Sequence, residues 1–313
     1  MKHSIPGRTL WLACTAAAAL TAAALRHWQL RTAFEEYTGL ARPWAQASVI
    51  LTCILVAAGA WFVLLAVSGR PLTEQARWEQ VFLYAKGPAY PVLEVAAAFF
   101  AIAAVPVLFI VGVGQFQIYQ EALEADIQPP TDNGLLTLAT AGGAFLAALG
   151  LLQAGRDCLH PGRRGRAGFS VALPGVAGCV WLMESFRAHA ANPVRWDYAP
   201  QLLAIMLGMA FYMDFAGMSA NAARPRRLLW MAGMTAVFSA VALVTAVSEL
   251  AARSNAGLSR CCTQLGDLLL LLSQTLAAVG VLWQLPPSLA GPSGPAEPPP
   301  DPTQEIQEDD TDE

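Results

Sequence analysis

Eight long stretches of the chain are almost free of charged side chains, and they limit the possible folds more than any other feature. The stretches are 17 to 24 residues long, and each holds at most one charged residue. An α-helix needs about 20 consecutive apolar residues to cross the roughly 30 Å hydrocarbon core of a bilayer. The sequence therefore predicts about eight transmembrane helices, at 9–25, 44–67, 91–114, 135–152, 169–186, 200–218, 228–250 and 265–285.

The composition of the whole chain agrees with a membrane protein. Hydrophobic residues make up 55% of the 313 positions and charged residues 13%, with a mean hydropathy of +0.44. Soluble domains carry about 25% charged residues, so a soluble globular fold is excluded, as is disorder of the apolar body. None of the stretches alternates apolar and polar residues as the strands of a membrane barrel do. We therefore expect an all-α, polytopic transmembrane helical bundle.

The first stretch permits a second interpretation. Lys2 and Arg8 precede an apolar run that passes through Ala22-Ala23-Ala24, which is also the layout of a cleavable signal peptide. Cleavage would leave seven helices and place the new amino terminus outside. We favour retention, because the other seven stretches need no separate secretion signal and a retained first helix fits the charges of the loops.

Basic residues in the loops predict how the chain is oriented. With eight spans, the side that holds both termini carries twelve of the 19 Lys and Arg residues, and the opposite side carries seven. The loop 115–134 on that opposite side holds acidic charges only. Because cytoplasmic loops are enriched in Lys and Arg, we expect both termini in the cytoplasm.

A short segment between the second and third spans has the pattern of a surface helix. Trp78, Val81, Phe82 and Ala85 recur at helical spacing within 71–86. This pattern predicts a short amphipathic helix on the cytoplasmic surface of the membrane. We favour a linker packed at the interface over the alternative, a coupling helix that docks a partner.

The end of the chain changes composition abruptly. Residues 286–313 are rich in Pro and carry eight acidic residues and no basic ones. Such a segment cannot bury apolar area, so we expect a transmembrane domain at 1–285 followed by a disordered tail. The tail is a candidate binding segment for a basic cytoplasmic protein, although a solvated tail is the default interpretation.

Two acidic residues inside predicted spans are candidates for function, because charged groups in lipid are costly. Asp214 lies toward the cytoplasmic end of its span, and Glu94 lies one turn into its span on the same side. If both face one cavity, they can bind a cation or relay a proton. We favour the alternative, in which each carboxylate reaches water or pairs with a loop arginine, namely Arg224, Arg226 or Arg227.

Three more acidic residues lie toward the outer face and are candidates for a charged vestibule that receives a solute: Glu184, Glu249 and Asp267. The alternative is ordinary ion pairing at the interface, which we favour. Arg187 follows Glu184 by three positions and Arg253 follows Glu249 by four, so each pair shares a helix face if the helix continues.

No motif points to an enzyme, a metal site or a cofactor. The chain has no phosphate-binding glycine loop, zinc-protease motif, serine-hydrolase elbow or dinucleotide fingerprint. Its longest segment outside the predicted spans is 28 residues, too short for a soluble catalytic domain. Cys158 and His160 make half of a metal site at best. We expect no cofactor and no nucleic-acid partner, and we leave open whether the protein is an enzyme, with the balance against it.

One segment resembles known proteins. Arg26-His27-Trp28-Gln29-Leu30, followed by Phe34-Glu35-Glu36-Tyr37-Thr38-Gly39-Leu40, resembles a stretch after the first helix in unnamed, uncharacterised bacterial multi-pass membrane proteins. The resemblance implies a bacterial plasma membrane and carries over no activity, cofactor or site.

The sequence supports two classes of function. The first is a transporter-like or channel-like protein for a small solute or ion, built on the intramembrane acidic residues. The second is a non-catalytic membrane subunit or sensor that works through the surface helix, the acidic tail and protein partners. The oligomeric state does not follow from the sequence.

Overall fold

Eight helices, one at each apolar stretch, make up most of the computed structural model of the protein. The structure describes residues 7–35, 40–42, 44–67, 81–82, 88–130, 133–159, 167–190, 198–220, 224–252 and 258–289. The helices are α1 (Arg8–Thr32), α2 (Gln46–Val67), α3 (Ala89–Glu124), α4 (Leu135–Leu159), α5 (Ala167–Ala190), α6 (Ala199–Ser219), α7 (Pro225–Ala252) and α8 (Leu258–Leu289). The predicted all-α fold is confirmed.

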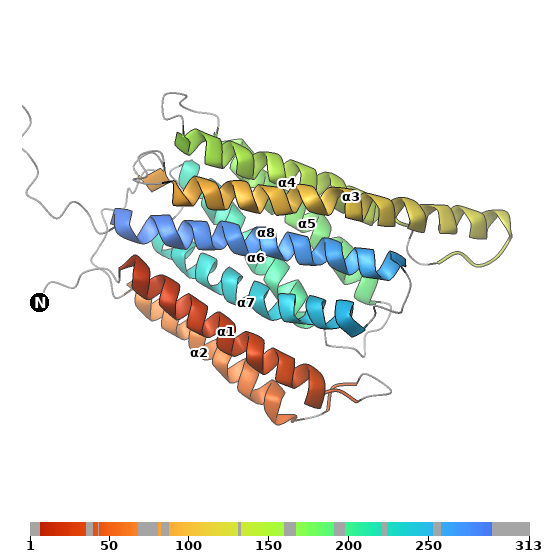
Figure 1. The fold of residues 1–313 in the computed structure, drawn as a ribbon, viewed down its shortest axis with the longest axis horizontal. Coiled ribbons are helices and arrows are strands. Elements are labelled where there is room, and N and C mark those ends of the chain that lie inside the picture. The colour runs from red at the N-terminus through yellow and green to blue at the C-terminus, as the bar shows by residue number, and fades with distance from the viewer. Residues whose placement is uncertain are drawn as a thin grey trace, which may run out of the picture.

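Seven of these eight helices are long and apolar enough to cross a membrane, which fits a multi-pass membrane protein. The exception is α5, whose 24 residues include Pro174, Glu184 and Arg187 beside several glycines. These residues lower its mean hydropathy. Helix α5 nevertheless packs against α4 and α6 and runs with them from one end of the bundle to the other (Figure 1).

Helices α3 to α8 form a closed ring. Each of the six packs against the next along the chain, and α8 returns to pack against α3. The remaining pair, α1 and α2, lies outside this ring, where both helices contact α7 and α1 also contacts α8 (Figure 1). The interior of the six-helix ring is therefore enclosed by protein on every side.

Consecutive helices run in opposite directions. Figure 1 shows that the start of α1 and the end of α8 lie at the same end of the bundle. We call this the terminal end, and the other the far end. An even number of passes is the arrangement that the apolar stretches predict, and the connections between the helices alternate between the two ends.

Two helices extend well beyond the predicted spans. Helix α1 continues to Thr32 instead of ending near residue 25, so Arg26 and Arg31, which lie past the predicted span, are helical. Helix α3 continues to Glu124 instead of ending near residue 114. Its 36 residues give a length of about 54 Å at 1.5 Å per residue, well over the thickness of the hydrocarbon layer. Hydropathy marks where lipid contact ends, whereas Gln, Glu, Ala and Leu continue the backbone helix into water.

The last helix also ends later than expected. Helix α8 continues through Pro286 and Pro287 to Leu289, beyond the predicted boundary at residue 285. A proline removes one backbone hydrogen bond, and in the final turn of a helix few such bonds remain to be lost. Residues 290–313 of the predicted tail lie outside the described residues.

The predicted surface helix is described only at Val81 and Phe82, and both are buried in the bundle core. Gln284 of α8 donates a hydrogen bond of 2.9 Å to the Val81 carbonyl oxygen. The Phe82 ring lies 5.0 Å from Tyr90 and 5.4 Å from Phe215, between ring centroids. These two residues therefore pack on the helices, as a linker does; Trp78, Ala85 and the rest of 71–86 lie outside the described residues.

Glycine and proline together permit a close crossing of α4 and α5. Pro174 of α5 has no N–H to donate to the carbonyl group of Ser170, four residues earlier. Gly150 of α4 packs directly against that carbonyl oxygen, and a Cβ at position 150 would overlap it. Only glycine allows α4 to approach α5 so closely at this level.

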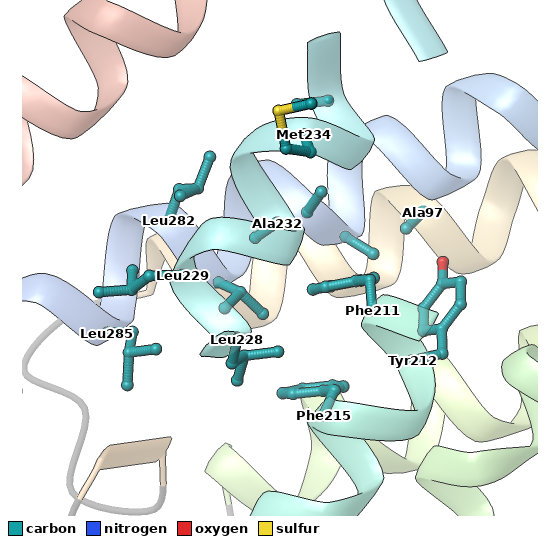
Figure 2. Packing of buried hydrophobic residues seen from close by; sticks show 14 of the residues in the cluster. Ala97, Phe211, Tyr212, Phe215, Leu228, Leu229, Ala232, Met234, Leu282 and Leu285 are labelled. Carbon is teal, nitrogen blue, oxygen red and sulfur yellow. The ribbon is translucent and has the colours of Figure 1, made fainter. Parts of the chain in front are cut away.

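The core near the terminal end is aromatic and aliphatic. Figure 2 shows Phe211 and Phe215 of α6 directed toward Leu228 and Leu229 of α7, with Leu282 and Leu285 of α8 close by. The phenyl rings of Phe211 and Phe215 are stacked, with their centroids 6.0 Å apart. This packing joins three helices of the six-helix ring and places Tyr212 beside α3, where the candidate site begins.

Candidate functional site

Glu94 is the most deeply buried ionisable group among the sequence-predicted candidates. It lies near the start of α3, toward the terminal end, and its exposed fraction is 0%. Two glycines make room for it. A Cβ at Gly280 of α8 would lie 3.4 Å from Glu94 Oε1, and a Cβ at Gly155 of α4 would lie 3.4 Å from Glu94 Cβ. The carboxyl group therefore lies where α3, α4 and α8 meet.

Neither carboxyl oxygen of Glu94 has a hydrogen-bond partner among the described residues. Three polar groups lie within electrostatic range of the carboxyl group: the hydroxyls of Tyr90 and Tyr212 and the thiol of Cys158. Tyr90 is one helical turn away on α3, and its hydroxyl is the donor that acts on the Glu94 carboxyl group, although the two do not reach standard hydrogen-bond geometry. Burying an ionised carboxylate without a cation or a well-aligned donor costs several kcal/mol or more, so ionisation of Glu94 at this position is unfavourable.

A small cavity lies in the interior of the six-helix ring. Its volume is about 40 Å³, and its walls come from α3, α4, α5, α6 and α8. A cavity needs about 10–15 Å³ of this volume for one water molecule, so two or three waters fit and an organic solute does not. The polar side chains that line the cavity are Thr140, Trp181, Tyr212, Ser273 and Gln274.

Gln274 holds the polar wall of this cavity in place. Its side-chain amide donates a 2.8 Å hydrogen bond to the carbonyl oxygen of Ala204 on α6 and a 3.0 Å hydrogen bond to the hydroxyl of Ser239 on α7. Gly208 of α6 leaves the space that the amide group occupies, because a Cβ there would overlap it. The side chain thus joins three helices across the interior of the ring.

A hydrogen-bonded network occupies the interior on the far side of the cavity. Asp267 of α8 is buried and accepts a 2.7 Å hydrogen bond from the indole N–H of Trp181 on α5. Its second oxygen accepts a 3.0 Å hydrogen bond from Gln201 of α6, which is only partly buried. The Gln201 amide also lies 3.4 Å from the Ser185 hydroxyl on α5. Because Trp181 also lines the cavity, the network connects the cavity to the far end of the bundle.

Glu184 lies in a second buried cluster near this network. Its Oε1 is 3.3 Å from the hydroxyl of Thr137 on α4, and the same hydroxyl is 3.0 Å from Oε1 of Gln115 on α3. Glu184 and Asp267 are both buried, so they face the protein interior and not an open vestibule. Glu249, the third predicted member, accepts a hydrogen bond from Gln264 of α8. Arg253, the pairing partner proposed for Glu249, lies outside the described residues.

Asp214 pairs with an arginine. Its Oδ2 lies 2.8 Å from Nε of Arg227 at the start of α7; the Arg227 side chain is 60% exposed and the Asp214 side chain 13%. For Asp214 this is the pairing that the favoured interpretation expected, whereas for Glu94, which is fully buried, that interpretation is wrong. Ion pairs with one exposed partner contribute about 0–1 kcal/mol, which suits a structural role for Asp214.

The sequence analysis missed the neutral members of the site. Trp181, Tyr212 and Gln274 carry no charge, so a search for charged residues in apolar stretches passes over them. Gln274 offered one usable clue, since an amide in the middle of an apolar stretch must find a partner inside the protein. Within the described residues, no three His, Cys, Asp or Glu side chains are grouped so as to hold a metal ion.

Comparisons with known proteins identify no relative of this chain. No protein-family model, curated protein or solved structure matches the chain. The resemblance of residues 26–40 to bacterial multi-pass proteins therefore stays a prediction, and the functional argument depends on the described residues alone.

Proposed function

We propose that the six-helix ring moves protons across the membrane, with Glu94 as the intramembrane group that binds and releases them. The observation that carries this proposal is a fully buried carboxyl group with no cation and no hydrogen bond of standard geometry among the described residues, whose neighbour Tyr212 lines a mostly apolar cavity of water size. Intramembrane acidic residues of this kind mark proton relays and ion paths in membrane proteins.

The polar groups are spaced along the ring in the order that a relay needs. Glu94 lies toward the terminal end, and Tyr212 both interacts with it and lines the cavity. Trp181 lines the same cavity and donates to Asp267. Gln201 then joins Asp267 to the partly exposed surface at the far end. The indole N–H of Trp181 only donates, so it orients the Asp267 carboxylate and does not carry the proton. Waters that extend from the cavity would have to pass the proton between Tyr212 and Asp267, a gap that no described side chain closes by a direct hydrogen bond.

The size and chemistry of the cavity favour protons over other cargoes. About 40 Å³ is far below the 300–1,000 Å³ of pockets that hold small molecules. The lining is mostly apolar, and its polar groups are hydroxyl, amide and indole groups, which can bind water but do not supply the charge that a metal cation requires. A carboxyl group at one side of such a cavity exchanges protons with its waters.

The orientation of the chain is part of the proposal. The start of α1 and the end of α8 lie at the same end of the bundle, and the loops of that end carry most of the basic residues. We propose that this end faces the cytoplasm of a bacterial cell, so that Glu94 is loaded from the cytoplasmic side.

Proton flux into liposomes tests the function. The purified chain is reconstituted into vesicles that contain a pH-sensitive dye, and a potassium gradient with valinomycin supplies the driving force. We expect vesicles with the wild-type chain to acidify faster than empty vesicles, and Glu94→Gln to reduce the protein-dependent rate at least about tenfold, because one positioned proton-transfer group contributes about 10²–10⁴-fold to a rate.

Asp214→Asn is the matched control, because it also neutralises an acidic residue in a span but one that is paired at the surface. It should retain flux close to that of the wild-type chain. Equal flux in Glu94→Gln and wild-type vesicles, at equal protein content, would remove Glu94 from the path. Wild-type vesicles no faster than empty ones would contradict proton movement altogether.

A further inference from the structure

A groove outside the six-helix ring runs along the seam between α1 and α7. Its volume is about 830 Å³, and it is open to the surface along its length. The α1 wall is formed by Leu20, Ala23, Ala24, His27, Leu30 and Arg31. The α7 wall is formed by Leu243, Val244, Val247, Ser248 and Ala251. The groove is therefore apolar along most of its length and basic at one end.

The two basic side chains sit together at that end. His27 and Arg31 are four residues apart on α1, so they project from the same face on consecutive turns, and both are exposed. Ser248 of α7 faces them across the groove. The described side chains that line the groove include no acidic residue to neutralise this end.

Aromatic residues place the basic end at the membrane surface. Trp28 is 40% exposed beside His27, and Trp44 is 89% exposed just before α2. Exposed tryptophans concentrate at the level of the lipid headgroups. His27 and Arg31 are thus at headgroup level, and Leu20 and Leu243, further along the groove, are at the depth of the acyl chains.

A buried arginine fixes the positions of α1 and α7 relative to each other behind the groove. Arg26 of α1 is fully buried, and its Nε donates a 3.0 Å hydrogen bond to the hydroxyl of Thr245 on α7. Another of its nitrogens donates to Gln29, whose amide donates in turn to Ser48 of α2 at 2.8 Å. These bonds join α1 to α7 and α2 behind the groove, so its walls do not depend on an occupant to stay in place.

We propose that this groove binds one anionic phospholipid, with its phosphate on Arg31 and His27 and an acyl chain along the α1–α7 seam. The charge of the basic end is complementary to a phosphate, and the apolar remainder matches a hydrocarbon chain in length and character. A groove that opens sideways at membrane depth receives its ligand from the bilayer. An arginine near the headgroups contributes about 1 kcal/mol toward an anionic lipid, so Arg31 favours it over a zwitterionic lipid by roughly fivefold, and the His27 ring adds a hydrogen-bonding group for the phosphate.

The test compares two lipids that share their acyl chains and differ in headgroup, one anionic and one zwitterionic. The purified full chain in detergent is titrated with phosphatidylglycerol or with phosphatidylcholine of the same acyl chains, and native mass spectrometry counts the bound lipids. We expect one phosphatidylglycerol per chain at roughly fivefold lower lipid concentration than phosphatidylcholine. The double variant His27→Gln/Arg31→Gln should lose this preference, whereas Arg42→Gln, an exposed basic residue outside the groove, should keep it.

A second variant blocks the apolar part without changing charge. Ala24→Phe fills the groove between α1 and α7, so it should reduce binding of phosphatidylglycerol at least severalfold. Ala139→Phe, at an exposed position on α4 away from the groove, should have no effect. Both variants are read alongside circular dichroism, so that a failure to fold is recognised and excluded.

Four results would overturn the lipid site. The first is equal binding of the two lipids by the wild-type chain, and the second is an unchanged preference in the double variant of His27 and Arg31. The third is saturation of the site by inorganic phosphate alone, which would make the acyl chain irrelevant. The fourth is a chain dimer that forms in place of lipid binding and that Ala24→Phe disrupts, which would identify the seam as a contact between two copies.

Discussion

Gly280 on α8 leaves the space that the carboxyl group of Glu94 on α3 occupies. A Cβ at position 280 would lie 3.4 Å from Glu94 Oε1 and 3.5 Å from both Leu93 Cβ and Tyr90 Cδ2. A methyl group is in ordinary van der Waals contact at these distances, but any larger side chain would press on the carboxyl group. The acidic residue and the glycine that makes room for it are therefore one structural unit.

Gly280→Val should destabilise the protein, and Gly280→Ala should be tolerated. The branched side chain overpacks the crossing of α3 and α8, which costs about 1–3 kcal/mol. The thermal unfolding midpoint in detergent measures the effect. Gly142→Val is the control, because a Cβ at position 142 meets nothing within 4 Å. Equal midpoints for the two valine variants would mean that position 280 is not crowded.

Gly208→Ala should destabilise the protein by displacing Gln274. The added methyl group overlaps the Gln274 amide, which then loses its hydrogen bonds to Ala204 and Ser239. We expect a cost of about 1–3 kcal/mol. In the double variant Gly208→Ala/Gln274→Ala the clash is gone, so the two effects should be clearly less than additive. Strict additivity would show that the two residues do not interact.

Trp181→Phe should loosen the network at the far end. The variant keeps an aromatic ring but removes the N–H that donates a 2.7 Å hydrogen bond to Asp267. Hydrogen bonds between membrane helices contribute about 0.6 kcal/mol on average and rarely more than about 1.7 kcal/mol, so we expect a loss within this range. Trp61→Phe, at a half-exposed position on α2, is the control for unfolding measurements and should change the midpoint little.

Arg26→Leu should weaken the attachment of α1 and α2 to the ring. Leucine keeps the apolar stem but not the charged hydrogen bond to Thr245, and bonds of this kind contribute about 1.5–3 kcal/mol. Arg42→Leu removes a charge from an exposed position and serves as the control. If protease digestion released α1–α2 equally from both variants and from the wild-type chain, Arg26 would have no such role.

The helices follow from the sequence because a membrane span depends on local composition. Each apolar stretch supplies the 20 or so residues that a span needs, wherever the other spans lie. The exact ends do not follow, since Glu124 and Leu289 extend helices in residues that hydropathy treats as polar. The closed ring of α3 to α8 does not follow either, because shape and small residues decide which helices pack.

The sequence analysis picked out acidic residues of the site as candidates, but it did not identify the neutral side chains that contact them. Glu94 and Asp267 stand out as acidic residues in apolar stretches, and Arg227 was among the arginines expected to pair with Asp214. The donor to Asp267 is Trp181, which is 86 positions away and carries no charge. Arg26 lies just past the predicted end of the first span, where a basic residue ordinarily faces water, whereas here Thr245 and Gln29 accept hydrogen bonds from it inside the protein.

The central claim is that protons cross through the small cavity between Glu94 and Asp267, and filling that cavity tests it most directly. Ala144 of α4 lines the cavity, and Gly142 of the same helix faces open space. Dye-loaded vesicles with Ala144→Leu should show at least about tenfold slower proton entry than those with Gly142→Leu, because the leucine displaces the waters that the path needs. Equal proton entry in the two kinds of vesicle, with both variants folded, would contradict the account.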